Sequence, residues 1–183
     1  CRPGAGDGDT MTERYTAPFT AQAQAVVDQA RDKGLKLATA ESCTGGLVSA
    51  ALTDIPGSSD VFDRGFVTYS NAAKIALLDV PESFFSDFGA VSQAVAIAMA
   101  NGALKRSDAD ITISITGVAG PGDSERKPAG LVHFSLAQRG EQTLAVEHHF
   151  RNLDRAGVRA AAVEEALRLL SGGIQRADSR IQV

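Results

Sequence analysis

The chain has 183 residues, of which 44% are hydrophobic and 22% are charged. This composition is typical of one globular domain, and a chain of this length buries roughly 70% of the surface that its unfolded form exposes. The sequence contains no apolar run of about 18 residues, so no membrane partner is expected. With Cys1 and Cys43 as the two cysteines, no disulfide framework is expected either, which favours a reducing, cytoplasmic compartment.

The 18 Lys and Arg residues are outnumbered by 22 Asp and Glu, for a net charge of −4. Such a chain has no basic excess with which to displace counterions from nucleic acid. Aromatic residues make up 5% of the chain and Trp is absent, which argues against a base-stacking surface. The histidines at 133, 148 and 149 have no Cys or His partner at a convincing ligand spacing. We therefore expect no resident metal and no cofactor.

The Gly- and Asp-rich start of the chain predicts a disordered extension over residues 1–19. Hydrophobic periodicity and turn residues then predict the following elements in chain order: helix 20–33, strand 35–41, helix 46–54, strand 64–70, helix 71–78, helix 92–106, strands 110–116, 131–138 and 143–150, and helix 154–170. Asn71 and Ser92 are expected to cap their helices, and Gly172 with Gly173 to end the last one.

Helices that alternate with strands predict an α/β fold, a three-layer α/β/α sandwich around a five-stranded mixed, mostly parallel sheet. The short connection at residues 139–142 makes the last two strands a hairpin, which requires an antiparallel pair. The folded domain is expected to cover residues 20–175, followed by a frayed tail at 176–183.

Three segments that could carry chemistry follow predicted strands, where open α/β sheets place their ligands. The first is TAESCTGG at residues 39–46, in which Ser42 stands at a strand-to-helix corner. The backbone N–H groups of residues 44–46 could face an anion there. An ordinary helix cap with glycines for a tight turn explains the same residues. Cys43 is expected to be a buried, small hydrophobic residue.

The second segment is TYSNAAK at residues 68–74. Lys74 falls in the first turn of a helix, where the helix dipole disfavours a cation, and a lysine with a depressed pKa can activate a serine. A solvated surface lysine is the alternative.

The third segment, residues 116–128, is rich in Gly and Pro. It is either a loop that approaches a ligand with its backbone or a flexible connection.

Together, the motifs TAESCTGG, RGFVTYSNAAK, GAVS and SITGVAGPGDSERKPAGLVHF resemble the C-terminal domain of the competence/damage-inducible protein CinA. Stand-alone members of that family are nicotinamide-nucleotide amidohydrolases. The resemblance runs in order from about Ala38 to Phe134 and extends over the flanking helices. The loop GPGDSERKP is one residue shorter than the family pattern, with Arg126 in place of an acidic residue.

The resemblance implies a Ser/Lys amidohydrolase that deamidates nicotinamide mononucleotide to nicotinate mononucleotide and ammonia, without an obligatory metal. It implies Ser42 as nucleophile, Lys74 as base and Tyr69 as an assistant in proton transfer or positioning. The residues implied for binding the phosphate, the ribose or the oxyanion are Thr44, Gly45, Gly46, Thr116, Gly117, Ala119, Gly120 and Lys127. Which glycine loop serves which group stays open.

Two other functions remain open at this point. One is a non-catalytic nucleotide-binding or regulatory module linked to competence or DNA damage, in which Ser42 would be only a cap or a phosphate ligand. The other is a hydrolase that acts on a different small amide or ester. The expected partner is a small-molecule mononucleotide, with a homodimer as a possible assembly.

Overall fold

The structure is a computed structural model that describes residues 17–124 and 127–177. The predicted extension and tail therefore lie largely outside the described residues. Within them, Ala17–Phe19 form a short 3₁₀ helix, and the side chain of Phe19 is buried in the core. Ala177, in the expected tail, is buried as well. The folded part is thus longer at both ends than predicted.

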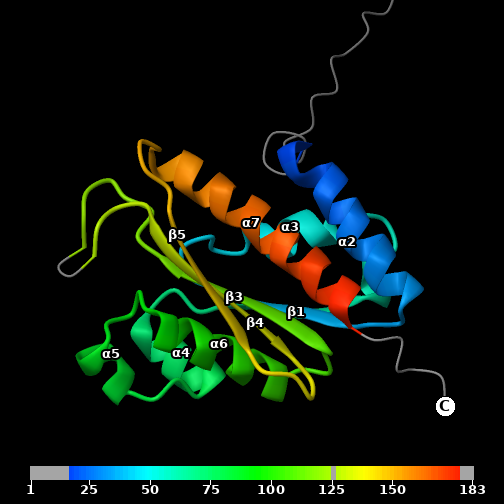
Figure 1. The fold of residues 1–183 in the computed structure, drawn as a ribbon, viewed down its shortest axis with the longest axis horizontal. Helices are drawn as coiled ribbons and strands as arrows, with labels where there is room; N and C mark the ends of the chain where they lie inside the picture. Colours follow the sequence, from blue (N-terminus) through cyan, green and yellow to red (C-terminus); the bar gives the residue numbers. More distant parts are fainter. Residues whose placement is uncertain (1–16, 125–126, 178–183) are drawn as a thin grey trace, which may run out of the picture.

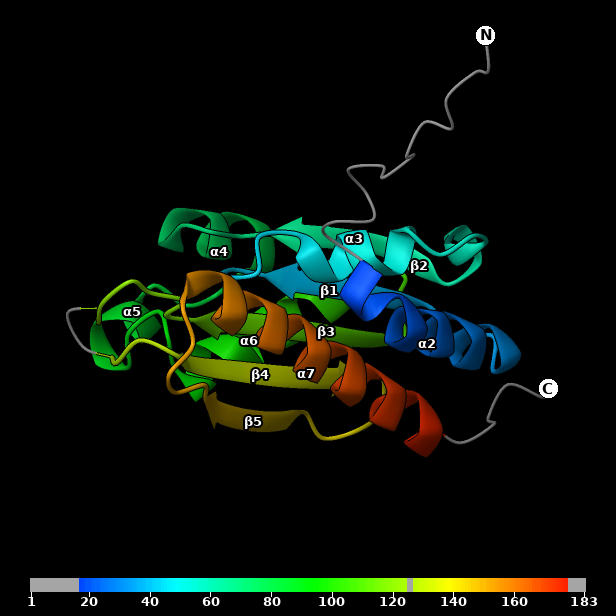
Figure 2. The same cartoon turned by 90° about the horizontal axis from the view of Figure 1, so that it is seen from above.

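The described elements follow one another in the order η1 (Ala17–Phe19), α2 (Thr20–Asp32), β1 (Leu37–Glu41), α3 (Leu47–Thr53), η2 (Ser58–Asp60), β2 (Phe62–Val67), α4 (Asn71–Leu78), α5 (Ser83–Asp87), α6 (Gln93–Lys105), β3 (Ile111–Gly117), β4 (Leu131–Gln138), β5 (Leu144–His149) and α7 (Arg155–Arg176). The five strands form one sheet in the order β2-β1-β3-β4-β5. Figure 2 shows this order from above.

Helices cover both faces of the sheet, so the predicted three layers are present. In Figure 1, α2, α3 and α7 lie on one face and α4, α5 and α6 on the other. Each face buries its own apolar cluster. The larger cluster packs Leu37 and Ile113 of the sheet against α2, α3 and α7, and the smaller one packs Ala40 against Leu78 and Met99 of α4 and α6. None of the described helices combines the length and apolarity needed to cross a bilayer.

The sheet is mixed, as predicted. β1 pairs in parallel with β2 and β3, whereas β3–β4 and β4–β5 are antiparallel pairs. The prediction of a mostly parallel sheet holds for strand direction, because among the five strands of the described chain only β4 runs opposite to the others. Of the four strand pairs, two are parallel and two are antiparallel. The carboxyl ends of β1, β2 and β3 therefore meet at one edge of the sheet, and the connection from β3 to β4 returns over that edge.

Several boundaries differ from the prediction. The short helix α5 was not expected, and β2 ends at Val67, which leaves Tyr69 beyond the strand. Ser70, rather than Asn71, caps α4, because its hydroxyl accepts a hydrogen bond from the Ala73 amide at 3.1 Å. Ser92 caps α6 as predicted, by accepting from the Val95 amide at 3.3 Å.

The prediction that Gly172 and Gly173 end the last helix is wrong, since α7 continues to Arg176. Gly173 instead allows α7 to pack closely against β4. A Cβ atom there would lie 2.6 Å from a Cδ of Leu136 on β4. The missing side chain therefore lets the helix approach the sheet closely, and this contact outweighs the poor helix propensity of glycine.

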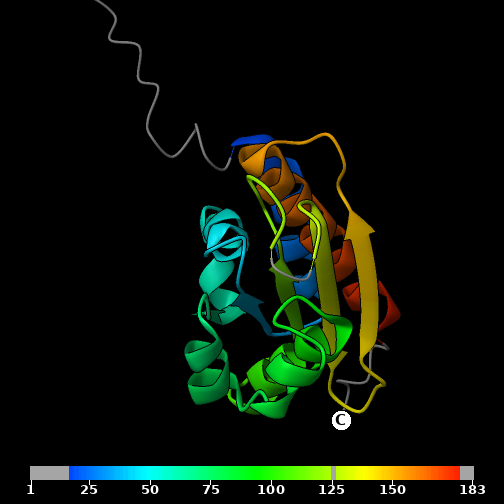
Figure 3. The same ribbon diagram turned by 90° about the vertical axis from the view of Figure 1, so that its left-hand side faces the viewer.

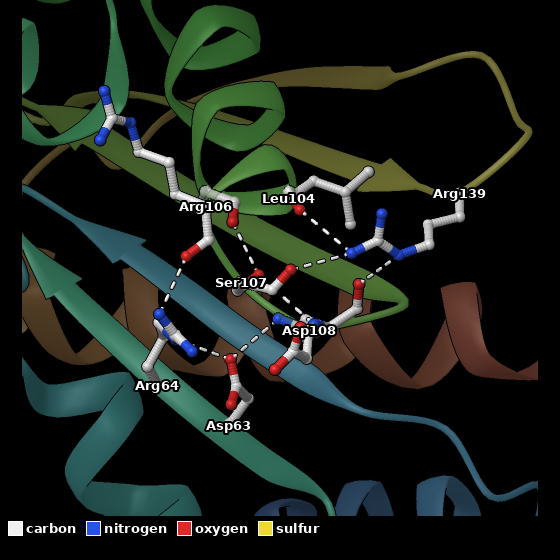
Figure 4. Close-up of polar contacts among 9 residues, drawn as sticks. Asp63, Arg64, Leu104, Arg106, Ser107, Asp108 and Arg139 are labelled. Carbon is white, nitrogen blue, oxygen red and sulfur yellow. Dashed lines mark hydrogen bonds and ion pairs between the residues drawn. The ribbon is translucent and has the colours of Figure 1, made fainter.

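Polar contacts fix the opposite edge of the sheet, where α6 turns into β3 (Figure 4). Arg64 donates to the Arg106 carbonyl at 3.0 Å, and the Asp63 carboxylate accepts from the Asp108 amide at 3.1 Å. Arg139 donates to the carbonyls of Leu104 and Ser107, at 3.3 and 2.9 Å. These contacts satisfy carbonyl groups at the end of α6, which would otherwise lack partners.

Candidate active site

Ser42 stands at the first position after β1, on the edge where the parallel strands end; Figure 3 views the molecule from this side. Its amide donates to the Ile115 carbonyl of β3 at 2.9 Å, and its carbonyl accepts from the Gly45 amide at 3.1 Å. The side-chain oxygen Oγ lies 3.0 Å from Nζ of Lys74 in α4. The structure therefore brings these two predicted residues into direct contact.

The ammonium group of Lys74 is held inside the protein, with 1% of the residue exposed. Besides Ser42, Nζ contacts the backbone carbonyls of Thr68 at 2.8 Å and Tyr69 at 3.3 Å. Burial lowers the pKa of Lys74 from 10.5 to about 8, because the buried site disfavours the charged form. A lysine with this pKa is partly neutral near neutral pH and can then accept the Ser42 proton. The alternative of a solvated surface lysine is thereby excluded.

The glycine turn after Ser42 differs from the expectation. Gly45 and Gly46 have φ values of +63° and +101°, which favour glycine. Their amides, however, are already engaged. The Gly45 amide donates to the Ser42 carbonyl at 3.1 Å, and the Gly46 amide to Oε2 of Glu41 at 2.9 Å. The prediction that these amides are free to face an anion is therefore wrong for Gly45 and Gly46.

A pocket with a volume of about 350 Å³ opens beside Ser42 and Lys74. The predicted binding residues that line it are Thr116, Gly117, Ala119 and Gly120. Those that do not line it are Thr44, Gly45, Gly46 and Lys127. The loop after β3 thus forms a wall of the pocket, whereas the glycine turn after Ser42 lies behind it. A larger cavity of about 870 Å³ lies at the β4–β5 hairpin, away from the Ser42–Lys74 pair.

Tyr69 lies at the pocket with 62% of its surface exposed. Its carbonyl contacts Lys74, but its hydroxyl is bound by Nη2 of Arg155 at 3.1 Å. Nη1 of the same guanidinium donates to the Gly120 carbonyl at 2.6 Å. Arg155 therefore joins two walls of the pocket, the segment before α4 and the loop after β3.

Sequence reasoning missed Arg155, which lines the pocket from the first turn of α7. A signal was available: directly after the helix cap Asp154, an arginine places its charge against the positive end of the helix dipole. Such a position is unfavourable unless the guanidinium has a partner elsewhere. Asn71, in the first turn of α4, also lines the pocket, whereas the sequence predicts only a helix cap at this position.

Cys43 is buried, as predicted. Burial raises the pKa of its thiol to about 11, so the thiol is protonated at neutral pH and a weak nucleophile. Among the described residues, no group of three or more His, Cys, Asp and Glu side chains could hold a metal ion. We assign no metal ligands on this part of the chain.

Comparison with known proteins places the chain in a family. The sequence profile of the CinA C-terminal domain matches residues 19–174. A putative competence-damage inducible protein of Symbiobacterium thermophilum is 50% identical over 156 residues, which cover 80% of this chain and 36% of that protein. The nicotinamide-nucleotide amidohydrolase PncC of Enterobacter agglomerans is 50% identical over 131 residues, which cover 71% of this chain and 79% of that protein.

Solved structures agree with this assignment. The competence/damage inducible protein CihA of Agrobacterium tumefaciens superposes with a TM-score of 0.83 at 43% identity, covering 86% of this chain and 96% of that one. The chain spans about a third of the length of several curated relatives that it matches, such as the Symbiobacterium thermophilum protein, where the share is 36%. The extent of the profile match, the shared fold and the identity of the relatives lead to one conclusion: the chain belongs to the CinA C-terminal domain family.

Proposed function

We propose that the protein is an amidohydrolase that converts nicotinamide mononucleotide to nicotinate mononucleotide and ammonia. The observation that carries this proposal is the 3.0 Å contact between Ser42 Oγ and the buried Nζ of Lys74, at the wall of a pocket. The choice of substrate is supported by the name of the Enterobacter agglomerans relative, a nicotinamide-nucleotide amidohydrolase.

The reaction needs two half-reactions. In the first, neutral Lys74 takes the proton of Ser42 while Oγ attacks the carboxamide carbon, which forms a tetrahedral oxyanion. Collapse of this intermediate breaks the C–N bond, and Lys74 returns the proton to the leaving nitrogen, which departs as ammonia. In the second, Lys74 deprotonates a water molecule that attacks the Ser42 ester. Ser42 leaves with the proton from Lys74, and the pyridine carboxylate is released.

The loop after β3 is the best source of donors for the oxyanion. The amides of Gly45 and Gly46 are bound within the protein. By contrast, no hydrogen bond among the described residues takes the amides of Ala119 and Gly120, which line the pocket with Ser42. Backbone N–H groups held in place before the reaction stabilise charge that develops in the transition state.

Arg155 and Asn71 suit the polar end of a mononucleotide. The Arg155 guanidinium at the pocket has five N–H donors, enough to bind phosphate in a bidentate manner beyond its two protein contacts. The pocket volume of about 350 Å³ lies at the small end of the range of roughly 300–1,000 Å³ for small-molecule sites. This size favours a mononucleotide over a larger ligand.

The test measures ammonia release from nicotinamide mononucleotide by the wild type, Ser42→Ala and Lys74→Ala, each with and without EDTA. We expect release by the wild type that survives EDTA, and a loss of at least about a thousandfold in both variants. Binding of the mononucleotide without ammonia release would instead support the nucleotide-binding module. Activity that persisted in Ser42→Ala would contradict the proposed nucleophile.

A further inference from the structure

The side chain of Glu41, the residue before Ser42, is fully buried beneath the first turn of α3. Its Oε2 accepts hydrogen bonds from the amides of Gly46 and Val48 at 2.9 and 3.1 Å. Its Oε1 accepts from the amide and the hydroxyl of Ser49 at 2.8 and 2.7 Å. Four donors from the protein thus converge on one carboxylate.

This arrangement fits a carboxylate and no neutral replacement of the same shape. An ionised carboxylate only accepts hydrogen bonds, so both of its oxygens can face N–H and O–H groups. A glutamine at position 41 would turn an NH₂ group toward donors on one side. Those donors would lose their partners inside the protein, which is destabilising. The negative charge also suits the positive end of the α3 dipole.

Glu41 is connected to both members of the Ser42–Lys74 pair. Its side chain holds the far end of the turn that begins at Ser42. Its backbone carbonyl accepts from the Thr68 amide at 2.8 Å, and the Thr68 carbonyl in turn binds Nζ of Lys74 at 2.8 Å. One buried residue therefore anchors the turn that presents the hydroxyl and the segment that receives the ammonium group.

We propose that Glu41 is a positioning residue: its carboxylate fixes the turn at residues 42–46 so that Ser42 Oγ faces Lys74 Nζ before any substrate binds. Glu41 does not line the pocket, so it acts through Ser42 and not on the substrate. The rate effect of this arrangement rests on the proposed function. The geometric effect on the Ser42–Lys74 contact does not.

The test compares the wild type with Glu41→Gln and Ser49→Ala, which deletes one donor to Oε1. Asp63→Asn is the matched control, because this carboxylate also accepts a backbone amide, at 3.1 Å, but at the opposite edge of the sheet. We expect kcat for ammonia release to fall about 10–100-fold in Glu41→Gln and about threefold in Ser49→Ala, with KM within twofold, since small misplacements of reacting groups have effects of this size. Asp63→Asn should lower the unfolding temperature without lowering kcat.

Crystal structures of the wild type and the variants give a readout that needs no turnover. We expect the Ser42 Oγ–Lys74 Nζ separation of 3.0 Å to lengthen beyond hydrogen-bond distance in Glu41→Gln. An unchanged separation, or a kcat within twofold of the wild type in the folded variant, would overturn the proposal. If Glu41→Gln does not fold, the same two measurements, kcat and the Ser42 Oγ–Lys74 Nζ separation, are made on Ser49→Ala and test the proposal. If the wild type releases no ammonia, the proposed function fails, and the crystallographic comparison still decides the role of Glu41.

Discussion

Lys74 Nζ and Ser42 Oγ lie 3.0 Å apart, although 32 positions separate the two residues in the chain. The sheet explains this proximity. Ser42 follows β1, Lys74 lies in the first turn of the helix after β2, and the two strands are parallel neighbours. Their carboxyl ends meet at one edge, and α4 then places the lysine side chain over the serine. The burial of Lys74 in this position has consequences for both rate and stability.

The rate should depend on the neutral form of Lys74. Because burial lowers its pKa to about 8, we expect kcat/KM for ammonia release to rise with pH and to level off above about pH 8. Lys74→Arg should be inactive over the same range, since guanidinium does not lose its proton. The measurement is a pH–rate profile from pH 6 to 9.5. A flat profile would contradict the role of Lys74 as base.

The free energy of unfolding should also depend on the protonation of Lys74, and it should increase with pH. The pKa of Lys74 is about 8 in the folded state against 10.5 for the free side chain, so between these values the unfolded chain binds more protons than the folded one. The stability contributed by Lys74 therefore rises with pH from about 8 to 10.5.

We expect the wild type to gain on the order of 3 kcal/mol relative to Lys74→Met across that interval. Denaturant unfolding of both proteins at several pH values between 7 and 10.5 measures this difference. Since the variant lacks the titrating amine, ionisable groups that do not interact with Lys74 cancel in the comparison. A constant difference across the interval would show that Lys74 is not desolvated as described.

Arg155 should control substrate binding more than the chemical step. Arg155→Met should raise KM for nicotinamide mononucleotide about 10–50-fold, with a smaller effect on nicotinamide riboside, which has no phosphate. The control is Arg168→Met on the same helix, where the guanidinium pairs with Glu165 at 2.6 Å and does not line the pocket. Equal losses for the two substrates would rule out a phosphate contact.

The glycine turn should be sensitive to a methyl group for conformational reasons. At Gly46, φ is +101° and a Cβ would meet Val67 at an ordinary distance of 3.5 Å. Gly46→Ala should therefore destabilise the protein by about 1–2 kcal/mol through backbone strain, and lower kcat because the strained turn carries Ser42.

The variant Gly140→Ala separates the loss of stability from the loss of kcat. Its φ is +77°, a Cβ there meets nothing within 4 Å, and it lies in the β4–β5 hairpin. We expect a comparable loss in unfolding free energy with kcat unchanged. Equal kcat values in Gly46→Ala and the wild type would mean that the turn does not need its present conformation for activity.

Much of the fold could be predicted because it follows from local patterns. The buried strands and the long helices repeat apolar residues at the periods of strands and helices. The five-residue helix α5, Ser83–Asp87, is too short to show such a period. The end of α7 was misjudged because the role of Gly173 depends on Leu136, a residue far away in the chain.

The same distinction between local patterns and contacts with distant residues explains which parts of the candidate site could be predicted. Ser42 and Lys74 could be proposed because each stands in a motif at the end of a predicted strand. Arg155 was missed because its partners Tyr69 and Gly120 come from two other segments of the chain. The prediction for the Gly46 amide is wrong because a sequence does not show that the side chain of Glu41 points toward this amide.

The reversed direction of β4 also determines which part of the site is free to vary. Because β4 returns directly beside β3, the connection over the pocket needs no crossover helix, unlike the segments that carry Ser42 and Lys74, which lead straight into α3 and α4. Residues can be inserted into that connection or deleted from it without moving a layer of the sandwich. Under the proposed function, a search for activity on new amides should therefore begin with libraries of loop length between β3 and β4 that keep Ala119 and Gly120, while Ser42 and Lys74 stay in place.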